Sequence, residues 1–230
     1  GPKAREILAR LTNADLTNDA FPFMRSAMID VAGVRCLALR VSFTGDLGWE
    51  LHCAAEDQPR LYEALLTAGR DFGAGPVGSR ALMSLRIEKG YGSWGREYSP
   101  EWWPQESGLA RLVKTDKDFL NKAAYMALAD KPARETLEIF EIDTTDADAS
   151  GGEPIFLPDG TPVGQVTSGA YGYSVGTSLA LGYVKAGTVA PGDTVHIAVL
   201  GRPHTARMLA APPFDPQGLR LRDKLPEPAG

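Results

Sequence analysis

Residues 42–51 decide the fold of this chain and read Ser42-Phe43-Thr44-Gly45-Asp46-Leu47-Gly48-Trp49-Glu50-Leu51. They predict a strand, a tight turn that contains glycine, and a second strand that carries an acid. About thirty residues later the chain reads Gly78-Ser79-Arg80-Ala81-Leu82-Met83-Ser84-Leu85-Arg86-Ile87-Glu88-Lys89-Gly90. This second stretch predicts a helix with an arginine in its first turn, and Ser79 is a plausible N-cap.

The composition is that of an ordinary globular protein. Its 230 residues are 43% hydrophobic and 23% charged, with a formal net charge of −5, and this length suffices for one large domain or two small ones. The chain has no run rich in Lys and Arg, so we expect no nucleic acid as a partner. It has neither an apolar run near the roughly 18 residues of a membrane span nor a signal-peptide pattern. We therefore expect no membrane partner and a cytoplasmic location, or the mitochondrial matrix in a eukaryote.

Residues that commonly form metal sites, disulfides or nucleotide sites are sparse. The two cysteines, Cys36 and Cys53, argue against a disulfide scaffold and fit a reducing compartment. The three histidines, His52, His196 and His204, are scattered and lack the spacing of metal ligands. No Gly-x-Gly-x-x-Gly fingerprint follows a predicted strand. The sequence thus predicts no metal site and no dinucleotide-binding half within this chain.

The first half of the chain mixes short helices with antiparallel hairpins, which indicates the α+β class rather than a parallel sheet. Apolar residues at helical spacing predict helices, and period-two alternation with a turn at Ala32-Gly33 predicts a hairpin. The predicted elements are helix 3–11, hairpin 27–43, strand 48–53, helix 57–72 and helix 79–89.

The second half of the chain is mostly β-structure. A long Gly/Pro-rich and aromatic loop at 90–108 and a short helix near 118–129 come first. Short strands then follow at even spacing between glycine turns, which predicts a small barrel or sandwich. The predicted strands are 136–143, 163–168, 179–184, 194–199 and 205–210. We expect a first domain at 1–112, a helical connector at 113–132, a β-barrel at 133–213 and a tail at 214–230.

Glu50 is the sharpest candidate for ligand binding. It alternates with Trp49 and Leu51 in a strand of otherwise core-like residues. A carboxylate can accept two parallel N–H donors from one ligand. Taken alone, a solvent-facing acid on a strand is the more common explanation.

Arg80 is the second candidate, because its position is mildly unfavourable for the helix. Cations are favoured near the C-terminal end of a helix, whereas Arg80 lies in the first turn. This indicates a task other than helix stability, although an exposed arginine whose small cost is tolerated explains the same pattern. Arg86 and Glu88, later in the helix, suit an ion pair or packing as well as ligand contact.

The loop at 90–108 is the third candidate, because aromatic side chains are concentrated in it. It contains Tyr91, Trp94 and the pair Trp102-Trp103. A tryptophan offers a large apolar face and one N–H donor, so these rings suit stacking on an aromatic ligand or closing a cavity. Burial against the β-rich half explains the tryptophans equally well.

Several motifs in combination resemble one protein family over residues 2–222. They are Gly45–Glu50, Arg80 with Leu85-Arg86-Ile87-Glu88, Trp94-Gly95, Pro104–Leu109, Thr167-Ser168-Gly169 and Pro213–Pro216. This combination resembles the glycine-cleavage T-protein (aminomethyltransferase) family. Lys89-Gly90-Tyr91 and Trp94-Gly95 look most like the C-terminal folate-binding module of sarcosine and dimethylglycine dehydrogenases.

The resemblance implies part of an α/β folate-binding domain with an antiparallel sheet, followed by a C-terminal β-barrel. It implies tetrahydrofolate as the cofactor, bound by Glu50, Arg80, Tyr91 and Trp94, with Glu50 facing the amino-pyrimidine edge of the pterin. It implies no catalytic residue in this chain, because the family's catalytic aspartate belongs upstream of the first helix. FAD is expected only in a separate upstream domain.

The function that the resemblance implies is that of the folate-binding C-terminal portion of a flavin-linked N-methyl amine demethylase. This module captures the one-carbon unit as 5,10-methylenetetrahydrofolate, so the expected partners are folate and the methylated amine or its iminium or formaldehyde product. An aminomethyltransferase and a non-catalytic folate-binding module remain open alternatives. Since a strand leads into the first helix in this family, we expect the chain to be part of a longer protein. We also expect an exposed sheet edge that favours self-association.

Overall fold

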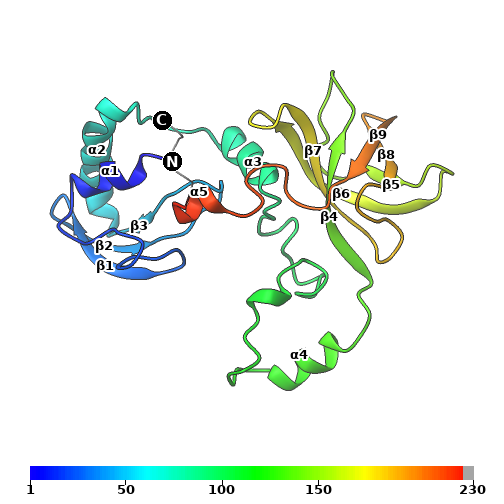
Figure 1. The fold of residues 1–230 in the computed structure, drawn as a ribbon, viewed down its shortest axis with the longest axis horizontal. Coiled ribbons are helices and arrows are strands. Elements are labelled where there is room, and N and C mark those ends of the chain that lie inside the picture. The colour runs from blue at the N-terminus through cyan, green and yellow to red at the C-terminus, as the bar shows by residue number, and fades with distance from the viewer. Residues whose placement is uncertain (225–230) are drawn as a thin grey trace. The chain divides into compact units, whose positions relative to one another are not determined.

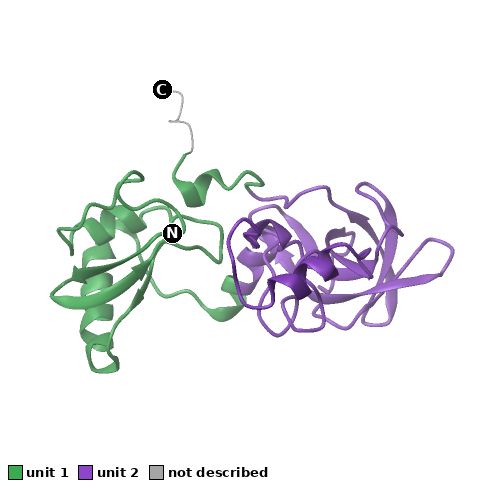
Figure 2. Cartoon of the chain, turned by 90° about the horizontal axis from the view of Figure 1, so that it is seen from below, with its two compact units in different colours: residues 1–82, 215–230 green, residues 83–214 purple. Residues whose placement is uncertain are grey.

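The computed structural model describes residues 1–224 and divides the chain into two compact units (Figure 2). Unit 1 contains Gly1–Leu82 and the segment from Asp215 on, and unit 2 contains Met83–Phe214. Helix α3, Ser79–Glu88, contributes residues to both units. No helix in the described part of the chain is both long enough and apolar enough to span a membrane.

Unit 1 is built on a three-stranded antiparallel sheet in the order β1-β2-β3, with α1 and α2 beside it (Figure 1). β1 (Ser26–Val31) and β2 (Val34–Leu39) form the hairpin that the alternating pattern predicts. Its turn residues, Ala32 and Gly33, both have positive φ. The other elements are α1 (Ala4–Ala9), β3 (Glu50–His52), η1 (Ala55–Asp57), α2 (Gln58–Gly69), η2 (Arg70–Phe72) and α5 (Leu219–Arg222).

One face of this sheet forms the core of unit 1. Val31, Cys36 and Ala38 point to that face and are fully buried. They lie in one apolar cluster with Leu8 of α1 and Leu61 of α2, so the two helices cover this face. Burying such side chains contributes roughly 1.5–3 kcal/mol for each large aliphatic group.

The opposite face of the sheet is open. Met28 of β1 and Leu37 of β2 are paired in register and are 50% and 40% exposed. Within residues 1–224, β1 and β3 each pair with β2 alone, which leaves an unpaired strand at either edge. Unit 1 therefore has the free sheet edge that the sequence led us to expect, and Met28 and Leu37 add exposed apolar surface.

The connection from β2 to β3 is longer than the tight turn that the sequence predicts. β2 ends at Leu39, and residues 40–49 link it to β3. Arg40 is 1% exposed and donates from Nη1 to the carbonyl of Phe21 at 2.6 Å. A buried guanidinium needs hydrogen-bond acceptors. Arg40 turns inward directly after Leu39, the last residue of β2.

Unit 2 is dominated by a closed antiparallel barrel of six strands in the order β4-β7-β6-β5-β8-β9 (Figure 1). The strands are β4 (Glu135–Ile142), β5 (Pro154–Phe156), β6 (Pro162–Gly172), β7 (Thr177–Lys185), β8 (Thr194–Val199) and β9 (Arg202–Met208). Two short helices, η3 (Ala110–Leu112) and α4 (Lys122–Ala129), precede them. This confirms the predicted α+β class with a C-terminal barrel, and adds β5.

Alternating strand residues fill the barrel. Phe140, Ile155, Val195 and Ile197 are fully buried within one apolar cluster. Closure leaves the barrel without a free edge. We therefore expect this unit to resist strand pairing with other chains better than the open sheet of unit 1 does.

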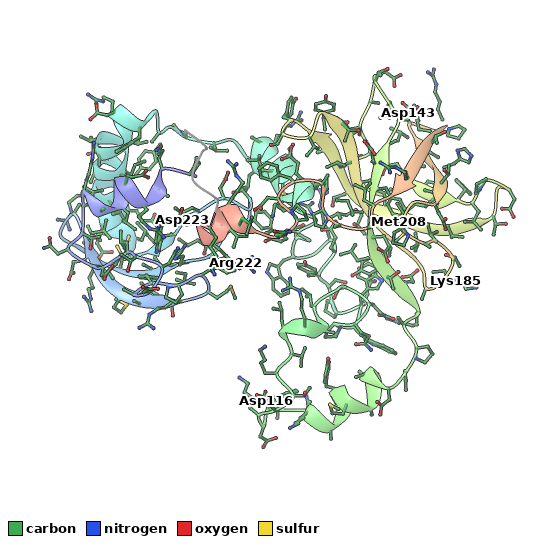
Figure 3. All side chains as sticks on the ribbon, in the orientation of Figure 1. Asp116, Asp143, Lys185, Met208, Arg222 and Asp223 are labelled. Carbon is green, nitrogen blue, oxygen red and sulfur yellow. The ribbon has the colours of Figure 1, made fainter. Side chains whose placement is uncertain are left out.

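Part of the segment that the sequence marked as a tail is ordered. Asp223, labelled in Figure 3, directly follows α5 and forms an ion pair with Arg5 of α1. Arg220 of α5 donates from Nε to Asp46 at 3.0 Å, and Leu221 is buried. These contacts tie residues 215–224 to unit 1, while 225–230 lie outside the described residues.

Candidate functional site

Glu50 opens β3 on the exposed face of the unit 1 sheet. It pairs in register with Leu39 of β2, while the flanking Trp49 and Leu51 pack against the core cluster. Its side chain is 56% exposed and contacts one polar group, Nε2 of His52, at 3.3 Å from Oε2. Most of the acceptor capacity of this carboxylate is therefore available to a ligand.

The residue before Glu50 is held firmly. The ring of Trp49 meets Phe21 edge to face at 6.1 Å, and the guanidinium groups of Arg40 and Arg5 lie 5.5 and 5.9 Å from its ring centre. Cation–π and aromatic contacts of this kind stabilise by roughly 0.5–1.5 kcal/mol each. The loop before β3 thus fixes the backbone that presents Glu50.

Arg80 is the second residue of α3 and is exposed. Within residues 1–224 its guanidinium makes no hydrogen bond or ion pair, either with Glu50 or with any other side chain. A cation without a partner in the first turn of a helix gains nothing from the helix dipole. Its five N–H donors are free to recognise an anionic or carbonyl group of a ligand.

Tyr91 and Trp94 lie in the loop that follows α3, in unit 2. Trp94 is 87% exposed, and its ring meets Tyr98 edge to face at 6.0 Å. Tyr91 is partly buried, with Nζ of Lys89 5.9 Å from the centre of its ring. Trp94 therefore offers an open aromatic face, while Tyr91 is already engaged by its neighbours.

A buried polar network fixes this loop. Oε2 of Glu97 accepts from Nη1 of Arg86 at 3.0 Å and from the backbone N–H of Ser93 at 2.8 Å, and both charged side chains are fully buried. Oε1 accepts from the hydroxyls of Thr167, at 2.6 Å, and Ser168. The network joins α3, the aromatic loop and strand β6 of the barrel.

The carboxyl of Glu97 stays ionised in this setting. Burial raises its pKa, but the hydrogen bonds from Ser168 and Thr167 and the nearby charge of Arg86 outweigh burial, so the pKa lies below its ordinary value. The sequence alone indicated no interaction partner for the motifs at Arg86 and at Thr167-Ser168, and it did not identify Glu97. The network joins residues far apart in the chain, so local sequence around a single acid in a glycine-rich loop did not indicate it.

The other tryptophans of the loop pack against protein. Trp102 stacks on Tyr183 of β7 with ring centres 4.0 Å apart and planes at 3°. Trp103 lies under the guanidinium of Arg134 at 4.5 Å. Packing against the barrel therefore explains Trp102, Arg134 engages Trp103, and Trp94 remains the exposed tryptophan of the loop.

Glu88, near the end of α3, is also buried. Its Oε1 accepts from the backbone N–H of Ser174 at 2.7 Å, and its Oε2 has no partner among the described residues. A packing role explains Glu88 better than exposed ligand contact does. No group of three or more His, Cys, Asp or Glu within residues 1–224 is arranged to hold a metal ion.

The predicted residues offer different ligand-binding groups within each unit. In unit 1, Glu50 supplies an open carboxylate and Arg80 a free guanidinium. In unit 2, Trp94 supplies an exposed ring, while Tyr91 is partly buried. An open carboxylate suits a ligand edge that carries N–H donors, and an exposed ring suits stacking on an aromatic ligand.

Two family models match the chain. The model described as GCVT N-terminal domain matches residues 1–117, and the glycine cleavage T-protein C-terminal barrel domain matches residues 136–215. A solved structure of glycine cleavage system aminomethyltransferase T from Bartonella henselae superposes with a TM-score of 0.78 at 24% identity, covering 92% of this chain and 57% of that one. This likeness supports the fold.

Curated relatives include both dehydrogenases and aminomethyltransferases. Mitochondrial dimethylglycine dehydrogenase of Mus musculus is 37% identical over 92% of this chain and 24% of its own length. Mitochondrial sarcosine dehydrogenase of Mus musculus is 32% identical over 96% and 25%. Aminomethyltransferase of Moorella thermoacetica is 34% identical over 92% and 57%. The chain thus spans about a quarter of the dehydrogenases and just over half of the aminomethyltransferase, and it belongs to the glycine-cleavage T-protein family.

Proposed function

We propose that this chain is the tetrahydrofolate-binding portion of a flavin-linked N-methyl amine demethylase of the dimethylglycine or sarcosine dehydrogenase type. The observation that carries folate binding is the open carboxylate of Glu50, which follows the partly buried Trp49 and is contacted by His52 alone among the described polar side chains. Similarity to dimethylglycine dehydrogenase, together with Lys89-Gly90-Tyr91 and Trp94-Gly95, favours the demethylase over other family members.

In this proposal Glu50 accepts two N–H donors of the pterin edge, and Arg80 donates to a neighbouring ligand oxygen. The family resemblance adds Trp94 and Tyr91 as further folate-binding candidates, and both lie in the loop of unit 2 that Glu97 anchors. When bound, tetrahydrofolate supplies the nitrogen atoms that take up the one-carbon unit. The residues of this chain hold it in place, so that capture as 5,10-methylenetetrahydrofolate precedes loss of the iminium or formaldehyde to water.

The oxidation of the methylated amine belongs, in this proposal, to FAD in a domain that precedes this chain in the intact protein. Such a protein would work in the cytoplasm, or in the mitochondrial matrix of a eukaryote. An aminomethyltransferase is the second candidate, because the Moorella thermoacetica enzyme is 34% identical over 92% of the chain. Flavin bound to the intact protein, and its reduction by an N-methyl amine, separates the two functions.

Calorimetric titration of the intact protein with a reduced-folate analogue tests the site. A charge-assisted hydrogen bond contributes roughly 1.5–3 kcal/mol, so Glu50→Ala should weaken binding by about one to two decades. Asp30→Ala is the matched control, because Asp30 is an exposed strand acid on the same sheet face, paired with Arg35 at 3.2 Å. If both variants bind the analogue like the wild type, the assignment of Glu50 is wrong.

A further inference from the structure

The two cysteines of the chain lie opposite each other on neighbouring strands. β2 and β3 are antiparallel, with Leu37 paired to His52. One step further along this register places Cys36 opposite Cys53, the residue that follows β3. Since Leu37 and His52 are on the exposed face, the cysteines share the inner face, where both contact the same apolar cluster.

This register suits a covalent bond between the two sulfur atoms. Residues directly opposite in an antiparallel pair have Cα atoms about 4.5 or 5.5 Å apart. Disulfides join residues whose Cα atoms lie about 4.4–6.8 Å apart, so either kind of pair fits. The two thiols also influence each other: burial raises the pKa of Cys36, and the neighbouring Cys53 raises it further.

The thiols differ in access to solvent. Cys36 is fully buried, and its Sγ contacts the carbonyl of Val34 at 3.5 Å. Cys53 is partly exposed, because β3 is an edge strand and ends one residue earlier. An oxidant from solvent therefore reaches Cys53 first, and Cys36 is placed to react from within.

We propose that Cys36 and Cys53 form a reversible intramolecular disulfide when the protein meets a peroxide. The Cys53 thiolate attacks one oxygen of hydrogen peroxide, the O–O bond breaks, and a sulfenic acid and one water form after proton transfer. Cys36 then attacks the Cys53 sulfur, the S–O bond breaks and a second water leaves. Two thiols are oxidised to one disulfide and one peroxide is reduced to two waters. A dithiol reverses the reaction by thiol–disulfide exchange.

The bond would fasten the three-residue strand β3 to β2. It closes a loop that runs from residue 36 to residue 53 and contains the Glu50 strand. Constraining a loop of this size stabilises by about 3 kcal/mol, which should raise the melting temperature of unit 1 by roughly 10–25 °C. Disulfides of this kind in a reducing compartment are transient and respond to redox conditions, so free cysteines and the proposed bond are two states of one site.

Peptide mapping of the peroxide-treated intact protein tests the bond directly. Trypsin cleaves after Arg35, Arg40 and Arg60, which puts the two cysteines on separate peptides, 36–40 and 41–60. We expect these peptides as one linked species after brief treatment with hydrogen peroxide, and as two free peptides after dithiothreitol. This readout needs neither folate nor catalysis, so it stands or falls independently of the proposed function.

Variants and mixed labelling complete the test. Cys53→Ser should abolish the linked species and the rise in melting temperature, while Cys36→Ala should trap Cys53 as a sulfenic acid that dimedone labels. A mixture of isotopically heavy and light protein should give links within one chain alone. Links between heavy and light chains, or peroxide treatment that leaves both thiols free or carries Cys53 to the sulfinic acid, would overturn the proposal.

Discussion

Replacement of Glu97 by glutamine should destabilise unit 2 strongly, because it leaves the guanidinium of Arg86 buried without a counter-charge. Both side chains are 0% exposed and lie 3.0 Å apart. Nε and Nη2 of Arg86 already lack partners among the described residues, and the other acceptor of Nη1 is the neutral carbonyl of Tyr91, at 2.9 Å. Removing one partner of a buried pair costs about 3–5 kcal/mol. We expect a loss of this size for Glu97→Gln.

A matched control exists in the same unit. Glu141 of β4 pairs with Arg207 of β9 at 2.7 Å, but their side chains are 36% and 59% exposed. Exposed pairs contribute about 0–1 kcal/mol, so Glu141→Gln should cost little although its ion pair is the shorter one. Burial, not distance, decides between the two outcomes.

Unfolding in guanidinium chloride, followed by tryptophan fluorescence, measures the stability of both variants. Three of the four tryptophans, at positions 94, 102 and 103, lie in unit 2, so the signal reports mainly on this unit. With a slope of roughly 4 kcal/mol per molar, the midpoint of Glu97→Gln should fall by about 1 M. A shift no larger than that of Glu141→Gln would refute the argument from burial.

Glu106→Gln should remove an acid-sensitive part of the stability of unit 2. Arg134 makes a two-point contact with Glu106 and lowers the pKa of this carboxyl from 4.5 to about 2. The contribution of Glu106 to stability, about 3 kcal/mol, is therefore complete above pH 5 and fades toward pH 2. Free energies of unfolding measured at pH 7 and pH 3 check this. Arg80→Ala should weaken binding of a folate analogue by up to a decade without lowering the melting temperature, because the helix loses an unfavourably placed cation. Leu37→Ser should reduce concentration-dependent light scattering by breaking the exposed apolar pair with Met28.

Periodicity predicted most of the regular structure, because local alternation and burial coincide in a hairpin and in barrel strands. Residues 34–38 alternate strictly between buried and exposed positions, as a strand with one covered face requires. Periodicity gave the spacing of the faces but not which face is buried. The core takes Cys36, Ala38 and Arg40, and the larger Leu37 is left exposed. Local sequence carries no information about which side α1 and α2 cover.

The candidate site was predictable only in part, for a related reason. Glu50 and Arg80 stand out in local sequence, since one is an acid in an apolar strand and the other is a cation at the wrong end of a helix. Glu97 does not stand out, because its meaning depends on Arg86 and on Ser168, which is 71 positions away in the chain. The disposition of Trp102 likewise depends on Tyr183 of the barrel.

Exposed charged residues and buried charged residues have different roles, for a physical reason. Charges that serve a ligand need exposed donor or acceptor capacity, which Glu50 and Arg80 keep, whereas charges that fix a loop must be buried and fully paired, as Glu97 is. A buried pair is rigid because every alternative conformation leaves a charge without a partner. The exposed ring of Trp94 therefore stands on a backbone that Glu97 holds in place. If the loop serves folate, Glu97→Gln should lower folate affinity even in solutions where the protein remains folded, whereas Glu141→Gln should leave it unchanged.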